Sequence, residues 1–149
     1  MAKRPLKIDE IEKILTNGVA GSLATTGPDG PYVVAVNYLY WEGKIYFHGP
    51  KDGRKMANIA FDPRVCFLAY ETTGFRRGAT PCAVSTLYRS VVIMGRAQVV
   101  AGPIALEALT RLGIKYSPET ADAPIPPEKL AITTVVEIAI DHLTGKAGD

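Results

Sequence analysis

The spacing of hydrophobic residues predicts a chain built mostly of short β-strands. Runs rich in valine, isoleucine and tyrosine, bounded by glycine, proline and asparagine, are typical of strands. The expected strands span residues 21–26, 32–40, 44–48, 65–70, 87–100 and 133–140. Pro28-Asp-Gly30 and Glu42-Gly43 are turn signals between the first three, so these three should form an antiparallel meander.

Helical spacing of apolar residues occurs in three places between these strands. Helices are expected near residues 8–15, 52–61 and 104–114. Asn17-Gly18 should end the first with a left-handed cap, and Asp62-Pro63 should end the second. Residues 74–81, the proline-rich stretch 118–127 and the polar end 144–149 are expected to lie outside regular structure.

Short connections between successive strands favour antiparallel pairing over the alternation of strands and helices seen in doubly wound sheets. About six such strands fit a closed or split barrel, because closure removes exposed strand edges. Gly95 interrupts the longest strand, where a bulge would let the barrel wall bend. The sequence predicts one mainly β domain spanning residues 1–149.

Composition supports a soluble domain and narrows its partners. The 149 residues are 47% hydrophobic and 21% charged, and the net charge is +2. This mild charge does not predict nucleic-acid binding, and no apolar run is long enough to predict a membrane span or a secretory leader. Cys66 and Cys82 are too few for a disulfide framework. We therefore expect a cytoplasmic protein.

Several common catalytic motifs are missing from the sequence. It contains no G-x-G-x-x-G, Walker loop, G-x-S-x-G or H-E-x-x-H pattern, which disfavours hydrolases and the common nucleotide-binding folds. A metal site would need His48, His142, Cys66 and Cys82 to converge, and no pair of them has the close spacing of structural zinc ligands. No metal is predicted.

The stretch from His48 to Lys55 is the strongest candidate for chemistry. It follows a strand, contains two glycines, opens a helix and places Lys51, Arg54 and Lys55 close together. Cations and the backbone N–H groups at a helix start both favour a bound phosphate. The alternative is a solvated basic turn, and spacing alone does not decide between them.

Three further positions carry polar groups within apolar or aromatic surroundings. Asn37 is an amide in an expected strand and, if buried, needs partners, either in a ligand or in a neighbouring strand. Tyr88-Arg-Ser90 offers an aromatic ring, a guanidinium and a hydroxyl, or is an ordinary strand edge. His48 could donate a proton or orient a ligand, although a histidine at a strand end is often structural.

Taken together, these segments resemble the flavin mononucleotide (FMN)-binding split-barrel proteins related to pyridoxamine 5′-phosphate oxidase, and within them the nitroimidazole-resistance-like branch. The resemblance follows the order of segments over nearly the whole chain. The segments are Gly21-Ser-Leu-Ala-Thr25, Tyr32-Val-Val-Ala-Val-Asn-Tyr-Leu-Tyr40, Gly43-Lys-Ile-Tyr-Phe-His-Gly49, Gly53-Arg-Lys55, Asp62-Pro-Arg-Val-Cys-Phe67, Ser85-Thr-Leu-Tyr-Arg-Ser-Val91 and Leu143-Thr-Gly-Lys146.

The resemblance implies a six-stranded antiparallel Greek-key split barrel that binds FMN between the two subunits of a homodimer. Arg54 and Lys55, with Lys51 nearby, would hold the phosphate. The implied contacts with the ring and ribityl chain come from Val34, Ala35, Val36, Asn37, Phe47 and His48. Tyr88, Arg89 and Ser90 would meet the flavin from the partner chain. His48 is the implied catalytic candidate.

One departure bears on the reaction. The carboxy-terminal tryptophan-and-arginine segment that completes the substrate site of true pyridoxamine phosphate oxidases has no counterpart here, so oxidation of that vitamer is not expected. The resemblance implies an FMN-dependent oxidoreductase for a small organic molecule, with a nitroaromatic such as a nitroimidazole as one candidate. The alternative is a protein that binds flavin, deazaflavin or haem for storage or sensing without turnover.

Overall fold

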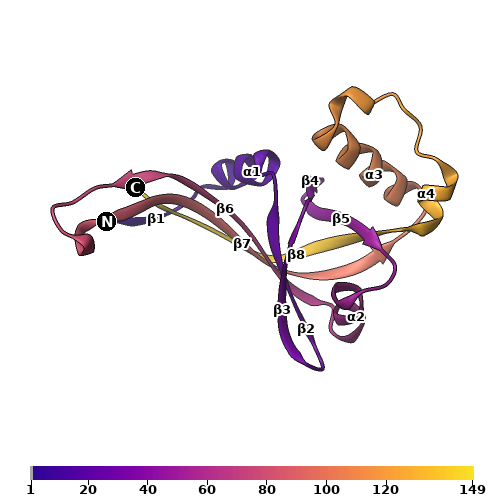
Figure 1. Cartoon of the computed structure of the whole chain (residues 1–149), viewed down its shortest axis with the longest axis horizontal. Coiled ribbons are helices and arrows are strands. Elements are labelled where there is room, and N and C mark those ends of the chain that lie inside the picture. Colours follow the sequence, from indigo (N-terminus) through magenta and orange to yellow (C-terminus); the bar gives the residue numbers. More distant parts are fainter. Residues whose placement is uncertain (1) are drawn as a thin grey trace.

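The computed structural model describes residues 2–149, which form one antiparallel sheet with helices around it (Figure 1). Within these residues the sheet has eight strands, in the order β3-β2-β6-β7-β8-β5-β4, and β1 pairs with β8. The strands are β1 (Lys3–Pro5), β2 (Gly21–Gly27), β3 (Gly30–Val36), β4 (Leu39–Trp41), β5 (Lys44–Pro50), β6 (Arg64–Arg76), β7 (Ser85–Val100) and β8 (Thr133–Gly148). The predicted class of antiparallel split barrel is confirmed, with eight strands in place of six.

The helices cover different parts of this sheet. They are α1 (Ile8–Asn17), α2 (Arg54–Phe61), α3 (Pro103–Tyr116) and α4 (Pro127–Ile132), with short 3-10 turns η1 (Pro81–Ala83) and η2 (Pro118–Thr120). In Figure 1, α1 lies on one side of β6 and β7, α2 lies beside β2, α3 lies near β4 and β5, and α4 lies at the start of β8. None of the helices within residues 2–149 combines the length and apolar character needed to span a bilayer.

The strand expected over residues 32–40 is broken in the structure. β3 ends at Val36 and pairs with β2, whereas β4 begins at Leu39 and pairs with β5, at the opposite end of the sheet. Tyr38 turns inward at the break. Its hydroxyl donates to the Leu15 carbonyl at 2.7 Å, and its N–H donates to the Tyr116 hydroxyl at 2.9 Å. A tertiary contact with α3 therefore divides a segment whose local pattern reads as one strand.

The polar end expected at residues 144–149 is strand as far as Gly148, whereas the loop expected at residues 74–81 is confirmed from residue 77 onward and begins only after β6 ends. β6 continues to Arg76 opposite Ser85, and β8 continues to Gly148 between β7 and β1. Backbone hydrogen bonds to β7 hold both segments, and β1 also pairs with residues 146–148 of β8, so neither segment needs a hydrophobic alternation of its own. The result is a projecting arm, which comprises β1, residues 70–76 of β6, residues 85–92 of β7 and residues 143–148 of β8 (Figure 1).

The expected ends of the helices and turns are confirmed in part. The first helix extends to Asn17, but Gly18 has φ −62°, so the expected left-handed cap is wrong. The second and third helices begin and end within two residues of expectation, whereas η2 and α4 add short helical turns to the segment expected to be irregular. Glu42 and Gly43 both have positive φ, as a tight hairpin turn requires.

The core fills the barrel, where side chains from β2, β5, β6, β7 and β8 meet α1. Leu15, Leu23, Phe67, Ile93 and Ile138 are fully buried there. The β7–β8 register shifts between Met94 and Gly95, which confirms the predicted irregularity at that glycine.

Candidate functional site

The barrel is open along a seam between β3 and the Phe47–Pro50 half of β5. Among the described residues β3 pairs only with β2, and β4 covers only the Lys44–Tyr46 half of β5. The free edge of β3 therefore presents backbone N–H and C=O groups to whatever lies in the seam. An extended edge of this kind recognises flat, polar ligands through main-chain hydrogen bonds.

The basic turn lies at one end of this seam. Gly53 precedes α2 with φ 122°, a conformation that favours glycine, and the first intrahelical bond runs from the Ala57 N–H to the Gly53 carbonyl. The Arg54 guanidinium lies 4.5 Å from the centre of the Tyr32 ring on β3, and the Lys55 Nζ lies 5.0 Å from the Phe47 ring on β5. Two successive cations thus reach the two sides of the seam.

The positive charges of the turn have no carboxylate partner among the described residues. Throughout residues 2–149 no carboxylate oxygen lies within 4 Å of Lys51, Arg54 or Lys55, although other cations of the chain form such pairs. Burial lowers the pKa of Lys55. Burial, and then the charge of Lys55, lower the pKa of His48. His48 is solvent-accessible but partly desolvated beside the turn, so the lowered pKa favours the neutral ring, which has one nitrogen able to accept a proton.

A buried hydrogen bond that the sequence did not predict holds this turn in place. The Asn58 side-chain amide on α2 donates to the Thr25 hydroxyl on β2 at 3.0 Å, and both residues are buried. Gly27, two residues further along β2, leaves the room that the Asn58 side chain fills. A lone asparagine in a short helix gives no sequence signal of this role, because its partner is distant in the chain.

The residues predicted to line the flavin ring lie along the seam edge with different orientations. Val34 and Val36 face the barrel interior side of β3, and Ala35 faces the opposite side. Phe47 is fully buried within the barrel. Asn37 is exposed in the break after β3, so its expected place within a strand is wrong and its amide needs no partner from a neighbouring strand. The structure leaves its amide free at the seam because Tyr38, and not Asn37, turns inward.

Alternation along β7 divides the three residues predicted to come from the partner chain. Tyr88 and Ser90 share one face, and the Tyr88 ring stacks on Tyr70 of β6 with centroids 5.7 Å apart. Arg89 points to the other face, where its guanidinium lies 3.9 Å from the Glu71 carboxylate on the side of α1. Ser90 is 4% exposed, and its Oγ has no hydrogen-bond partner among the described residues.

One copy of the chain does not bring Tyr88 and Ser90 to the basic turn. On β8, His48 lies opposite Val135 and Tyr88 lies opposite Gly148. At about 3.3 Å per residue, the strand between those two partners runs roughly 40 Å. The two groups lie in different parts of the molecule, the turn at the barrel and the tyrosine pair on the arm.

The residues at the seam fit a phosphorylated, planar cofactor. Two unpaired cations and the N–H groups at the start of α2 provide phosphate donors, and the free edge of β3 provides donors and acceptors for a ring. The Ser90 hydroxyl on the arm is buried and has no hydrogen-bond partner among the described residues.

Comparisons with known proteins identify similar folds and a matching family. No curated protein matches the sequence. Among solved structures, similar folds occur in a Bacteroides thetaiotaomicron protein named for 5-nitroimidazole antibiotic resistance (20% identity, TM-score 0.82, covering 99% of this chain and 89% of that one). They also occur in an FAD-binding protein from Mesorhizobium loti (23%, 0.72, 100% and 100%). A third example is an FAD and heme binding protein from Mycobacterium smegmatis (16%, 0.89, 100% and 74%).

At these identities the likeness is one of fold. The family model described as pyridoxamine 5′-phosphate oxidase matches residues 7–147. The match includes the seam, the basic turn and most of the arm. The chain therefore belongs to the pyridoxamine 5′-phosphate oxidase family.

Proposed function

We propose that the protein binds FMN in the seam and acts as an FMN-dependent oxidoreductase on a small organic molecule in the cytoplasm. The observation that carries this proposal is the placement of Arg54 and Lys55 on the two sides of an open barrel edge, with no carboxylate within 4 Å of either in the described chain. Unpaired neighbouring cations at a helix start favour a bound phosphate over a structural role.

In this proposal the residues of the basic turn hold the phosphate. Arg54 donates from its guanidinium, Lys55 from its ammonium, and the first N–H groups of α2 complete the set, with Lys51 adding charge nearby. Val34 to Asn37 would hold the ring, because the free edge of β3 offers N–H donors and C=O acceptors to its polar groups. Phe47 is buried in the barrel core and supports this edge from inside, and the exposed Asn37 amide is available at the open end.

A second copy of the chain completes the site. The face of the sheet that carries Ala35, Leu68 and Met94 is covered by none of the helices of the described chain, and Val33 and Met94 are exposed on it. An apolar sheet face of this kind is buried in a symmetric dimer. The tyrosine pair and Ser90 lie on the same face further along β7, so a two-fold arrangement places them against the partner.

FMN supplies hydride or electron transfer to such a site. The residues of the chain exclude water, fix the ring and move a proton. His48 is accessible beside the seam and its lowered pKa favours the neutral ring, so the ring can accept a proton from the substrate or orient a polar group of it. The relatives with similar folds include one named for nitroimidazole resistance, which makes a nitroaromatic compound the first substrate class to test.

Binding without turnover is the second candidate. One structural relative is an FAD and heme binding protein. Purified protein that carries FMN and yet oxidises no nicotinamide cofactor and reduces no nitroaromatic acceptor would favour storage or sensing. A deazaflavin in the same site would have a different absorption spectrum and mass.

The test is a titration of apoprotein with FMN and with riboflavin, which lacks the phosphate. Wild-type protein should bind FMN far more tightly than riboflavin. Arg54→Ala/Lys55→Ala should raise the Kd for FMN at least about a hundredfold, because it removes two charge-assisted bonds, and should leave riboflavin binding unchanged.

A matched control removes two exposed lysines elsewhere. Lys13→Ala/Lys129→Ala changes net charge equally and should leave both Kd values at the wild-type level. If wild-type protein binds FMN and riboflavin equally, or if the turn variant retains wild-type affinity for FMN, the phosphate assignment is wrong.

A further inference from the structure

One face of the arm carries four side chains that stand together across three strands. Tyr70 of β6 pairs with Ser90 of β7, and Ser90 pairs with Lys146 of β8. Directly paired residues of neighbouring strands project to the same side of a sheet. Tyr88, two residues before Ser90, projects to that side as well and stacks on Tyr70. We call this set, Tyr70, Tyr88, Ser90 and Lys146, the arm cluster.

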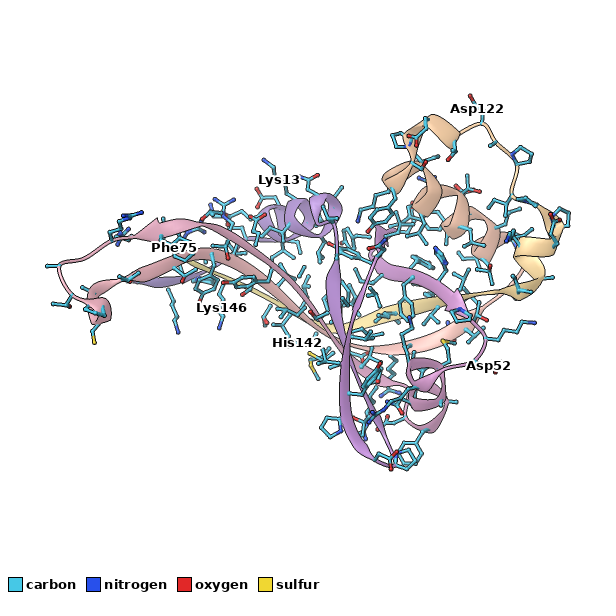
Figure 2. All side chains as sticks on the ribbon, viewed as in Figure 1. Lys13, Asp52, Phe75, Asp122, His142 and Lys146 are labelled. Carbon is cyan, nitrogen blue, oxygen red and sulfur yellow. The ribbon has the colours of Figure 1, made fainter. Side chains whose placement is uncertain are left out.

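Arg89 is not part of the arm cluster. It projects to the opposite side of β7, toward α1. Its guanidinium lies 3.9 Å from the Glu71 carboxylate, and both residues line a pocket with Glu10 of α1. Figure 2 shows Lys146 on the side of the arm away from α1. The cation that accompanies Tyr88 and Ser90 is therefore Lys146, although the two basic residues are far apart in sequence.

Two members of the arm cluster lack partners in the described chain. The buried Ser90 hydroxyl makes no hydrogen bond within the described residues, and a buried polar group in this state destabilises the fold until it gains a partner. No carboxylate oxygen within residues 2–149 lies within 4 Å of the exposed Lys146 ammonium. A donor, a cation and two stacked aromatic rings suit a flat ligand with an electronegative edge.

We propose that Lys146, together with Ser90, donates to the oxygen- and nitrogen-bearing edge of the flavin ring held by the partner subunit, and that Arg89 has no contact with the flavin. This inference rests on the proposed function, since it requires both flavin binding and the dimer. It assigns the partner-side cation to the carboxy-terminal strand. It also gives a reason for β8 to continue as an ordered strand to the end of the arm.

The experiment compares Lys146→Met with Arg89→Met, a matched pair in which a long cationic side chain becomes a long apolar one. Lys146→Met should raise the Kd about tenfold for FMN and by the same factor for riboflavin, because the bond is to the ring and not to the phosphate. Ser90→Ala should also weaken both. Arg89→Met should stay within twofold of wild type for both ligands.

Two further measurements separate this role from a structural one. Sedimentation equilibrium should give the same dimer mass for wild type and Lys146→Met. The reduction potential of bound FMN should fall in Lys146→Met, because a cation near that edge favours the negatively charged reduced form.

Each other outcome overturns a distinct claim. Equal affinities for Lys146→Met and wild type, a loss confined to FMN, or a dissociated dimer would overturn the role of Lys146. A loss in Arg89→Met equal to that in Lys146→Met would overturn the distinction between the two faces. Wild-type protein that binds neither flavin would instead overturn the proposed function.

Discussion

The bond between Asn58 and Thr25 is the support of the basic turn, and its removal is the most direct test of how α2 is positioned. Thr25→Val keeps the shape of the side chain and removes the hydroxyl that accepts from the Asn58 amide at 3.0 Å. Both residues are almost fully inaccessible to water, with exposures of 2% and 4%. Water therefore cannot replace the lost partner without the helix moving.

The expected loss follows from the cost of one buried, unsatisfied donor. That cost is about 2 kcal/mol, and for a chain of this length it lowers the Tm by roughly 4–8 °C. Because α2 carries Arg54 and Lys55, the same variant should also weaken FMN binding if α2 moves away from β2 so that water reaches the unpaired Asn58 amide. Asn58→Ala should have a similar effect, and the double variant should lose less than the sum of the two.

Thermal and urea unfolding of the apoprotein measure these effects. Thr26→Val, at the next and exposed position of β2, is the control and should stay within about 0.5 kcal/mol of wild type. If Thr25→Val has the same Tm and free energy of unfolding as the Thr26→Val control, the hydrogen bond does not hold α2 to the barrel. The same conclusion follows if the losses of stability in Thr25→Val and Asn58→Ala add up in the double variant.

Two further predictions concern stability away from the turn. Gly95→Ala should destabilise the protein by about 1–3 kcal/mol, because a Cβ there would collide with the Ala139 carbonyl oxygen. Gly113→Ala, in open space on α3, should instead stabilise it by up to about 1 kcal/mol. Urea unfolding in which both variants change the free energy of unfolding in the same direction would contradict this. Burial lowers the pKa of Lys115 from 10.5 to about 8, so between these values the folded protein binds fewer protons than the unfolded chain. The free energy of unfolding of wild type, relative to Lys115→Met, should therefore rise from pH 8 to 10.5, and a constant difference would refute the burial of a charged Lys115.

Local patterns in the sequence predicted the parts of the fold whose causes are local. The helices at residues 8–17 and 54–61 follow from apolar spacing, and the turn at Glu42-Gly43 follows from its residues. The basic turn was also visible, because its glycines and cations are consecutive. Each of these needs only neighbours within a few positions along the chain.

The arm and the break after Val36 could not be predicted in this way. Residues 144–148 are polar and look like a tail, yet they are held between β7 and β1 by main-chain bonds to residues more than fifty positions away. Asn37 looked like a buried strand residue because the contact of Tyr38 with Tyr116 of α3 is invisible in the local pattern.

The sequence by itself determined a mainly β chain with a cationic turn before a short helix, since periodicity, turn residues and charge are properties of adjacent positions. Only the tertiary structure decided which cations share a face with which partners. Strand alternation turns Arg89 away from Tyr88 and Ser90, and strand pairing brings Lys146 beside them from the other end of the chain. The same packing joins Asn58 to Thr25 and leaves the seam open between β3 and β5. These relations depend on register and closure, which are set by the whole sheet.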